Sequence, residues 1–424
     1  MGAPNGIANG ESPPLPYIDL EFDNKNVDES ARALVYRIQP KWRDAPGQLE
    51  IVKFTDGITN TLLKVAKYLP GQSQAEVDRD SILLRAYGNH TEILIDRDRE
   101  ARSHALAADR NLAPPLLARF KNGLLYRYII GQVCSPQDLI SEHVWRAVAK
   151  RLGEWHARLP VTSMVPVQDG NGAVDGVDGA GGSAPGSEQP QHCSHPAARK
   201  PAQNIWEVMQ KWTDALPCDT PKQRARKELL QNELNRSIRD LDNGRGPGTN
   251  GLVFGHCDLL SANVIMLPPK DKNSSSSISG DGTIEVSFID YEYATPCPAA
   301  FDIANHFAEW GGYDCDYNML PTKSVRRQFL QDYLESYKAH SDIPVPNDML
   351  DVLHDEVDRY RGMPGLYWDI WALIQATISQ IDFDYASYAE VRLGEYFAWR
   401  AEQDGHRVKE GSEMPLRERR WAEN

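Results

Sequence analysis

Apolar positions in the first part of the chain fall into short runs separated by turn residues, a pattern typical of strands. These runs span residues 49–54, 61–65, 82–87 and 124–130. Helical stretches are predicted before the first run, at 28–42, and before the last one, at 97–110. Short strands with few helices predict a small mixed lobe over residues 16–131.

The rest of the chain, residues 132–424, is predicted to form a larger lobe that is mostly helical from Asp302 onward. Two stretches rich in Gly, Ser and Asp interrupt it, at 161–203 and 271–282. They have little apolar surface to bury, so both are predicted to be exposed, disordered insertions. Residues 1–15 are predicted to be a disordered tail. The pattern as a whole predicts an α+β fold of two lobes.

Composition narrows the possible functions of this 424-residue chain. Hydrophobic residues make up 41% and charged residues 25%, which is an ordinary globular balance. The net charge of -14 argues against a nucleic-acid surface but leaves room for a local nucleotide pocket. The six cysteines show no paired spacing and are expected to be reduced. No apolar run is long enough for a transmembrane helix and no secretion signal is visible, so a cytoplasmic location is expected. The oligomeric state stays open.

The most specific pattern is HCDLLSAN at residues 256–263, with the spacing His-x-Asp-x-x-x-x-Asn found in the catalytic loop of kinases. Asp258 in this position would accept a hydrogen bond from an attacking hydroxyl and orient it for phosphoryl transfer. The amide oxygen of Asn263 could ligate Mg²⁺ without adding a charge. Taken alone, the pattern could also be a loop with a capped turn.

An apolar strand that ends in two acids follows the catalytic-loop pattern. Residues 284–289 are predicted to pair with 264–267 as a hairpin, and Asp290 and Glu292 come directly after. A carboxylate at a strand end beside a catalytic loop is the expected place for the main Mg²⁺ ligand, here Asp290. Asp290 or Glu292 could instead be a turn-forming acid without a role in metal binding, because one acidic ligand for Mg²⁺ can be enough.

The helix predicted at 301–310 places its polar residues away from its apolar stripe. Asp302 could cap this helix, or its carboxylate could hold the backbone amides of the catalytic loop. Glu309 could lie beside a cationic substrate, and the alternative is a solvated surface acid.

The small lobe offers a turn and a charge pair that could bind phosphate. The turn consists of Thr55, Asp56, Gly57, Ile58, Thr59 and Asn60. Its backbone amides could bind phosphate oxygens, although an ordinary hairpin turn would look the same. Arg85 on a later strand and Glu100 on the next helix follow the kinase order in which a basic residue grips phosphates and an acid fixes it. A plain surface ion pair is the alternative.

Aromatic residues gather late in the chain. They are Tyr367, Trp368, Trp371, Phe383, Tyr385 and Tyr388. Such a stripe is usually core, but aromatic rings also attract a substrate ammonium group by about 0.5–2 kcal/mol per contact.

With these residues in view, the chain resembles the choline/ethanolamine kinase family, whose fold is protein-kinase-like. The resemblance covers about residues 16–403, apart from the two insertions. HCDLLSAN resembles the family's catalytic loop, FIDYEYATPCPAAFDIANHFAEW its following signature, and FTDGITNTL its phosphate-proximal turn.

The resemblance implies ATP and Mg²⁺ as cofactors and roles for specific residues. Asp258 would be the catalytic base, Asn263 and Asp290 would bind magnesium, and Arg85 would contact phosphate. The adenine-binding hinge would comprise Tyr128, Ile129 and Ile130, up to Gly131. The alcohol pocket would comprise Tyr293, Trp368, Trp371, Phe383 and Tyr388, with Glu292 and Glu309 as further substrate residues.

Ethanolamine is the preferred substrate by resemblance, because YGNHTEILIDRDRE and the double leucine after Asp258 are more similar to the ethanolamine branch. The product would then enter the CDP-ethanolamine route to phosphatidylethanolamine. Cys257 stands where many members have Asn, and Leu260 where choline kinases often have Gln. The alternatives are a choline kinase and an inactive kinase fold that serves as a binding module.

Overall fold

The computed structural model describes residues 15–54, 60–88, 91–159, 161, 203–241, 244–268, 284–379 and 381–424. The predicted tail, most of the phosphate-proximal turn and most of both predicted insertions lie outside these residues. No helix in the described part of the chain is long and apolar enough to cross a membrane.

A six-stranded sheet forms the first lobe, in the order β1-β5-β6-β4-β3-β2. Its strands are β1 Tyr17–Ile18, β2 Leu49–Phe54, β3 Asn60–Lys67, β4 Ile82–Tyr87, β5 Leu116–Phe120 and β6 Gly123–Arg127. Neighbouring strands pair antiparallel, except that β1 runs parallel to β5 at the edge. All four predicted strands are confirmed, while β1 and β5 add two that the apolar pattern does not predict.

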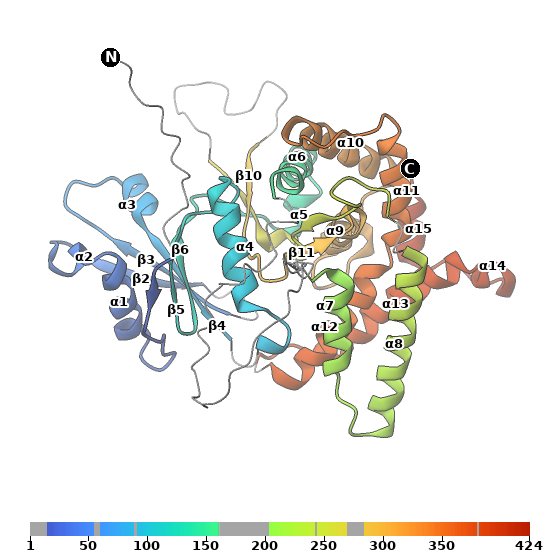
Figure 1. The fold of residues 1–424 in the computed structure, drawn as a ribbon, viewed down its shortest axis with the longest axis horizontal. Helices are drawn as coiled ribbons and strands as arrows, with labels where there is room; N and C mark the ends of the chain where they lie inside the picture. The colour runs from blue at the N-terminus through green and yellow to red at the C-terminus, as the bar shows by residue number, and fades with distance from the viewer. Residues whose placement is uncertain are drawn as a thin grey trace, which may run out of the picture.

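Helices flank this sheet on two sides, one facing away from the second lobe and one facing towards it (Figure 1). The helix predicted at 28–42 is in fact two helices, α1 Val27–Ile38 and the short α2 Lys41–Asp44. Pro40 separates them, because its ring has no N–H for a continuing helix. α1 buries Ala31, Leu34 and Val35 in the same apolar cluster as strands β3 and β4. The other helices of this lobe are α3 Gln74–Asp80 and α4 Arg97–Asp109.

Two small sheets in the second lobe carry the chemistry-bearing loops. β7 Gln132–Val133, β9 Val264–Met266 and β10 Val286–Phe288 form one, in the order β10-β9-β7. The predicted hairpin is confirmed in its antiparallel pairing, with Val286 opposite Met266. β8 Val253–Gly255 pairs with β11 Thr295–Cys297 in the other small sheet.

The remaining chain is helical, as predicted, and packs around one large core. Its helices are α5 Pro136–Leu139, α6 Glu142–Arg158, α7 Ile205–Ala215, α8 Pro221–Leu241, α9 Ala299–Ala308, α10 Lys323–His340, α11 Met349–Tyr360, α12 Met363–Ile378, α13 Tyr385–Gln403, α14 His406–Glu410 and α15 Leu416–Ala422. In Figure 1 these helices occupy the side opposite the six-stranded sheet, and α4 lies between the two.

Candidate active site

The loop between β8 and β9 is held from beneath by the carboxylate of Asp302 on α9. One oxygen accepts the amide hydrogen of His256 at 2.9 Å, and the other accepts that of Cys257 at 2.7 Å. His156 Nε2 donates to the same carboxylate at 2.9 Å. Burial opposes ionisation, but the bonds from His156 and the loop lower the pKa of Asp302. Of the two structural roles predicted for Asp302, the hold on the loop amides is confirmed.

Two more side chains fix the course of the loop. Asn305 donates to the Cys257 carbonyl at 3.1 Å, and His306 Nδ1 contacts the Leu259 carbonyl at 2.7 Å. Burial lowers the pKa of His306 to about 4, so its ring is neutral at physiological pH. A carbonyl oxygen can only accept, so Nδ1 carries the proton and Nε2 accepts the indole hydrogen of Trp310 at 3.1 Å.

The loop places Asp258 at the wall of a cavity of about 220 Å³ between the lobes. Asp258 is 9% exposed, and Asn263 donates its amide hydrogens to the Asp258 backbone carbonyl at 2.8 Å and to its carboxylate at 3.2 Å. Burial raises the pKa of Asp258 well above its ordinary value, and the neighbouring acids Asp290, Glu309 and Glu292 raise it further. All five residues line the cavity.

Asp290 reaches the cavity from a strained turn after β10. Its φ of 67° lies in the left-handed region, where non-glycine residues other than Asn and Asp are rare. The amide of the preceding Ile289 donates to the Asn263 carbonyl at 3.0 Å, which sets the two predicted magnesium residues side by side. Burial raises the pKa of Asp290, with Arg85 opposing the shift.

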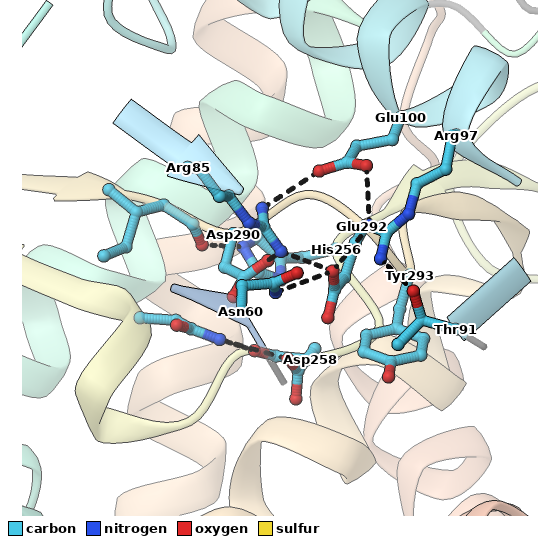
Figure 2. A network of polar contacts seen from close by, with 12 residues as sticks. Asn60, Arg85, Thr91, Arg97, Glu100, His256, Asp258, Asp290, Glu292 and Tyr293 are labelled. Carbon is cyan, nitrogen blue, oxygen red and sulfur yellow. Dashed lines mark hydrogen bonds and ion pairs between the residues drawn. The ribbon is translucent and has the colours of Figure 1, made fainter. Parts of the chain in front are cut away.

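Arg85 on β4 is the centre of a buried ion-pair network (Figure 2). Its guanidinium pairs with Glu100 at 3.0 Å and Asp290 at 2.7 Å, and it also pairs with Glu292. The predicted pairing of Arg85 with Glu100 is therefore confirmed. Because Asp290 and Glu292 belong to the second lobe, the same arginine ties the lobes together.

Arg97 on α4 is a second member of this network, and the sequence pattern does not predict it. It pairs with Glu100 at 2.9 Å and with Glu292 at 3.1 Å, and its guanidinium lies 3.9 Å from the ring centre of Tyr87. Asn60 donates to Glu292 at 3.2 Å. Although burial opposes it, Arg85 and Arg97 lower the pKa of Glu292, which lines the cavity as an ionised acid.

One end of the cavity is largely apolar. It is lined by Phe54, Leu62, Leu83, Tyr128, Ile129, Gly131, Val133, Leu260 and Ile265. A Cβ at Gly131 would lie 2.4 Å from a methyl carbon of Ile265 and 2.5 Å from the Met266 carbonyl, so this backbone passes close to β9. Of the predicted hinge, Tyr128, Ile129 and Gly131 line the cavity; Ile130 is not among its lining residues. Of the predicted phosphate turn, Asn60 lines it, and Thr55 to Thr59 lie outside the described residues.

The other end is aromatic. Trp371 donates its indole hydrogen to the Tyr293 hydroxyl at 2.8 Å, and Trp368 donates to the Asn305 side chain at 2.9 Å. The two indole rings meet edge to face with centroids 5.4 Å apart. Tyr388 lines the same end, together with Tyr313, which the sequence pattern does not predict.

Glu309 and Phe383 complete the predicted substrate residues. Glu309 is buried, lines the cavity, and pairs with Arg392 of α13 at 2.9 Å. Phe383 packs behind the wall, 5.6 Å from Tyr388 between ring centres, and is not among the lining residues.

Comparison with known proteins relates this geometry to a family. The profile of choline/ethanolamine kinases matches residues 51–397, which is more than half of the chain. The chain belongs to the choline/ethanolamine kinase family. A probable ethanolamine kinase of Nematostella vectensis is 30% identical over 90% of this chain and 96% of that protein. Ethanolamine kinase 1 of Mus musculus is 30% identical over 92% and 95% of the two chains.

Solved structures of choline/ethanolamine kinases share the fold. Plasmodium vivax ethanolamine kinase has a TM-score of 0.63 at 22% identity, over 88% of this chain and 89% of that one. Choline kinase from Cryptosporidium parvum has a TM-score of 0.58 at 18% identity, over 89% and 97% of the two chains. The expected protein-kinase-like fold with a strand-rich first lobe and a helical second lobe is therefore confirmed.

The structure also shows where the side chain of Cys257 lies, at the position where the sequence departs from the asparagine of many choline/ethanolamine kinases. Cys257 has a φ of 61°, in the left-handed region that Asn adopts more readily than most residues. Its sulfur is buried 3.8 Å from that of Cys297, so the side chain packs beneath the loop and does not line the cavity. The substitution therefore leaves the cavity wall unchanged.

Proposed function

We propose that this member of the family transfers the γ-phosphoryl group of ATP to the hydroxyl of ethanolamine. The observation that carries the proposal is the position of Asp258 in one cavity with an apolar end and an aromatic, acidic end. An adenine ring suits the apolar end, and a small cationic alcohol suits the other end.

Asp258 would accept a hydrogen bond from the substrate hydroxyl and orient its oxygen toward the γ-phosphorus. A raised pKa makes its ionised form a stronger proton acceptor as the P–O bond forms. Asn263, which donates to the Asp258 carboxylate, would keep that carboxylate in one orientation. Arg85, which lines the cavity while its guanidinium pairs with Glu100, Asp290 and Glu292, would add positive charge facing the phosphates.

The oxygen donors of Asn263 and Asp290 fit Mg²⁺, which prefers oxygen ligands. Within the described residues, no group of three or more His, Cys, Asp or Glu forms a metal site. A magnesium ion held here would therefore take its remaining ligands from phosphate oxygens and water. When bound, it would neutralise charge that develops on the β- and γ-phosphates.

The aromatic end would recognise the substrate ammonium group. A primary ammonium has three N–H donors and favours acids and hydroxyls, here Glu309, Tyr293 and Tyr388. A trimethylammonium group has no donors and favours the faces of Trp368 and Trp371. Because of this aromatic lining, choline is the competing candidate substrate. The ethanolamine kinases among the similar proteins support ethanolamine.

The test is to supply ethanolamine and choline separately to purified protein with Mg²⁺ and ATP and to follow ADP release. We expect a higher kcat/KM for ethanolamine, and an equal or higher value for choline would overturn the choice of substrate. Asp258→Ala should abolish turnover while ATP binding stays measurable by calorimetry. Turnover retained by Asp258→Ala would remove Asp258 from its role. Wild-type protein that binds ATP but phosphorylates neither alcohol would favour the inactive binding module.

A further inference from the structure

The acid in the aromatic end of the cavity is attached to a buried row of charges that leads away from the cavity. Glu309 pairs with Arg392 at 2.9 Å, and Arg392 pairs with Glu395 one helical turn later at 3.5 Å. Glu395 faces Arg417 of the C-terminal helix α15 at 4.0 Å. Arg417 in turn pairs with Glu418 at 2.9 Å.

Arg392 is the residue of this row that contacts Glu309 directly. Its side chain has no exposed surface, and its guanidinium also lies 5.7 Å from the ring centre of Tyr388, a lining residue. An arginine buried so completely is expected to keep one geometry, because leaving its partners would strand a charge in the protein interior. One side chain therefore touches both the acid and an aromatic ring of the substrate wall.

Ionisation of Glu309 depends on the same contact. Burial raises the pKa of Glu309, while Arg392 opposes that shift. Without the arginine, a buried acid beside Asp258 and Glu395 would favour its neutral form, which attracts an ammonium group much less strongly.

We propose that Arg392 is a positioning residue for substrate recognition, which holds the Glu309 carboxylate aimed into the amino-alcohol end of the cavity. Among the described residues it contacts none that line the apolar end, and it would act on the substrate through Glu309 and Tyr388. The inference rests on the proposed function, since it assumes that this end of the cavity receives the ammonium group.

Arg400 offers a matched control on the same helix. It is nearly as buried, at 5% exposure against 0% for Arg392, and it pairs with the partly exposed Asp240 at 2.7 Å and donates to Tyr396 at 2.8 Å. These partners do not line the cavity. Arg400→Gln therefore removes a buried charge from the same helix. Any change in KM that it causes measures the general structural effect of losing such a charge.

The experiment measures KM for ethanolamine, KM for ATP and kcat in the wild type, Arg392→Gln and Arg400→Gln. We expect Arg392→Gln to raise KM for ethanolamine about tenfold, the loss of one charge-assisted contact, with KM for ATP unchanged. Arg400→Gln should leave both KM values unchanged. In the Glu309→Gln background, Arg392→Gln should produce little further rise, because the acid through which it acts is already neutral.

Equal ethanolamine KM values in Arg392→Gln and Arg400→Gln would overturn the inference, and so would full additivity with Glu309→Gln. If Arg392→Gln does not fold, Arg392→Lys takes its place against Arg400→Lys. Lysine keeps the positive charge but lacks the planar guanidinium group, so Arg392→Lys should raise KM for ethanolamine less than Arg392→Gln would, with KM for ATP unchanged. No rise in KM for ethanolamine would overturn the inference. A wild-type protein that does not phosphorylate ethanolamine would instead overturn the proposed function, which keeps the two failures distinct.

Discussion

The hold of Asp302 on the catalytic loop makes Asp302→Asn a demanding test of the structure. The carboxylate accepts from the amides of His256 and Cys257 and from His156, at 2.9, 2.7 and 2.9 Å. Asparagine has the same shape but only one acceptor oxygen. If that oxygen accepts from His256 and His156, the side-chain NH2 group takes the place of the other oxygen and faces the N–H of Cys257. Two donors then meet without an acceptor between them.

The expected loss of stability follows from the hydrogen bonds that Asp302→Asn removes or weakens. Hydrogen bonds to a charged acceptor contribute about 1.5–3 kcal/mol each, and those that survive weaken because the acceptor becomes neutral. Asp302 is fully buried, so no water replaces the missing partner. We expect the free energy of unfolding to fall by about 3–5 kcal/mol. We also expect kcat to fall about a hundredfold, because the released loop carries Asp258, the proposed catalytic base.

The assay is urea unfolding of the wild type, Asp302→Asn and the control Asp332→Asn, together with kcat on ethanolamine. Asp332 is also a helical acid, and it pairs at 2.9 Å with Arg146, which is partly exposed. Asp332 is 8% exposed, but asparagine can still accept from Arg146, so its replacement should cost only about 1–2 kcal/mol and leave kcat unchanged. If the two variants were equally stable and equally active, Asp302 could not be what holds the loop.

Three further substitutions test other parts of the site and the core. Arg85→Lys should lower kcat/KM for ATP at least about tenfold and reduce the melting temperature, because one ammonium cannot replace a fork that binds three carboxylates; kinetics with varied ATP would show this. Trp371→Phe keeps a ring but removes the donor to the Tyr293 hydroxyl, so KM for ethanolamine should rise a few-fold, or about 1 kcal/mol. Burial raises the pKa of Asp369 to about 8, so the unfolded state loses this proton first and stability should fall as pH rises from about 4 to 8. Asp369→Asn should remove that slope in urea unfolding at pH 5 and pH 8, and parallel pH profiles for variant and wild type would contradict it.

Features that depend on neighbouring residues could be predicted from the sequence. The catalytic loop lies within eight consecutive positions, and its spacing predicts the chemistry before any fold is known. Strands β2 and β4 have the bounds that their apolar runs predict. The pairing of Arg85 with Glu100 could be predicted because their order along the chain is that of kinases.

Features that depend on how the lobes meet could not be predicted. The contact of Arg85 with Glu292 joins positions 207 residues apart, and that of Arg392 with Glu309 joins positions 83 apart. Nothing in a local pattern distinguishes these charges from a solvated surface acid or base. β5 was not predicted for a different reason: its sequence LLARF shows no clear apolar pattern, and its place depends on pairing with β6.

The ion-pair network around Arg85 also has a consequence for the form in which the nucleotide can bind. In Figure 2 the carboxylates of Glu100, Asp258, Asp290 and Glu292 outnumber the guanidinium groups of Arg85 and Arg97. A bare triphosphate would meet this excess of negative charge with its own, at distances where the low dielectric strengthens repulsion. The same triphosphate already carrying a divalent cation brings the opposite sign to the carboxylates. We therefore expect free ATP to bind more weakly than its magnesium complex in calorimetric titrations, because these carboxylates would repel the uncomplexed triphosphate.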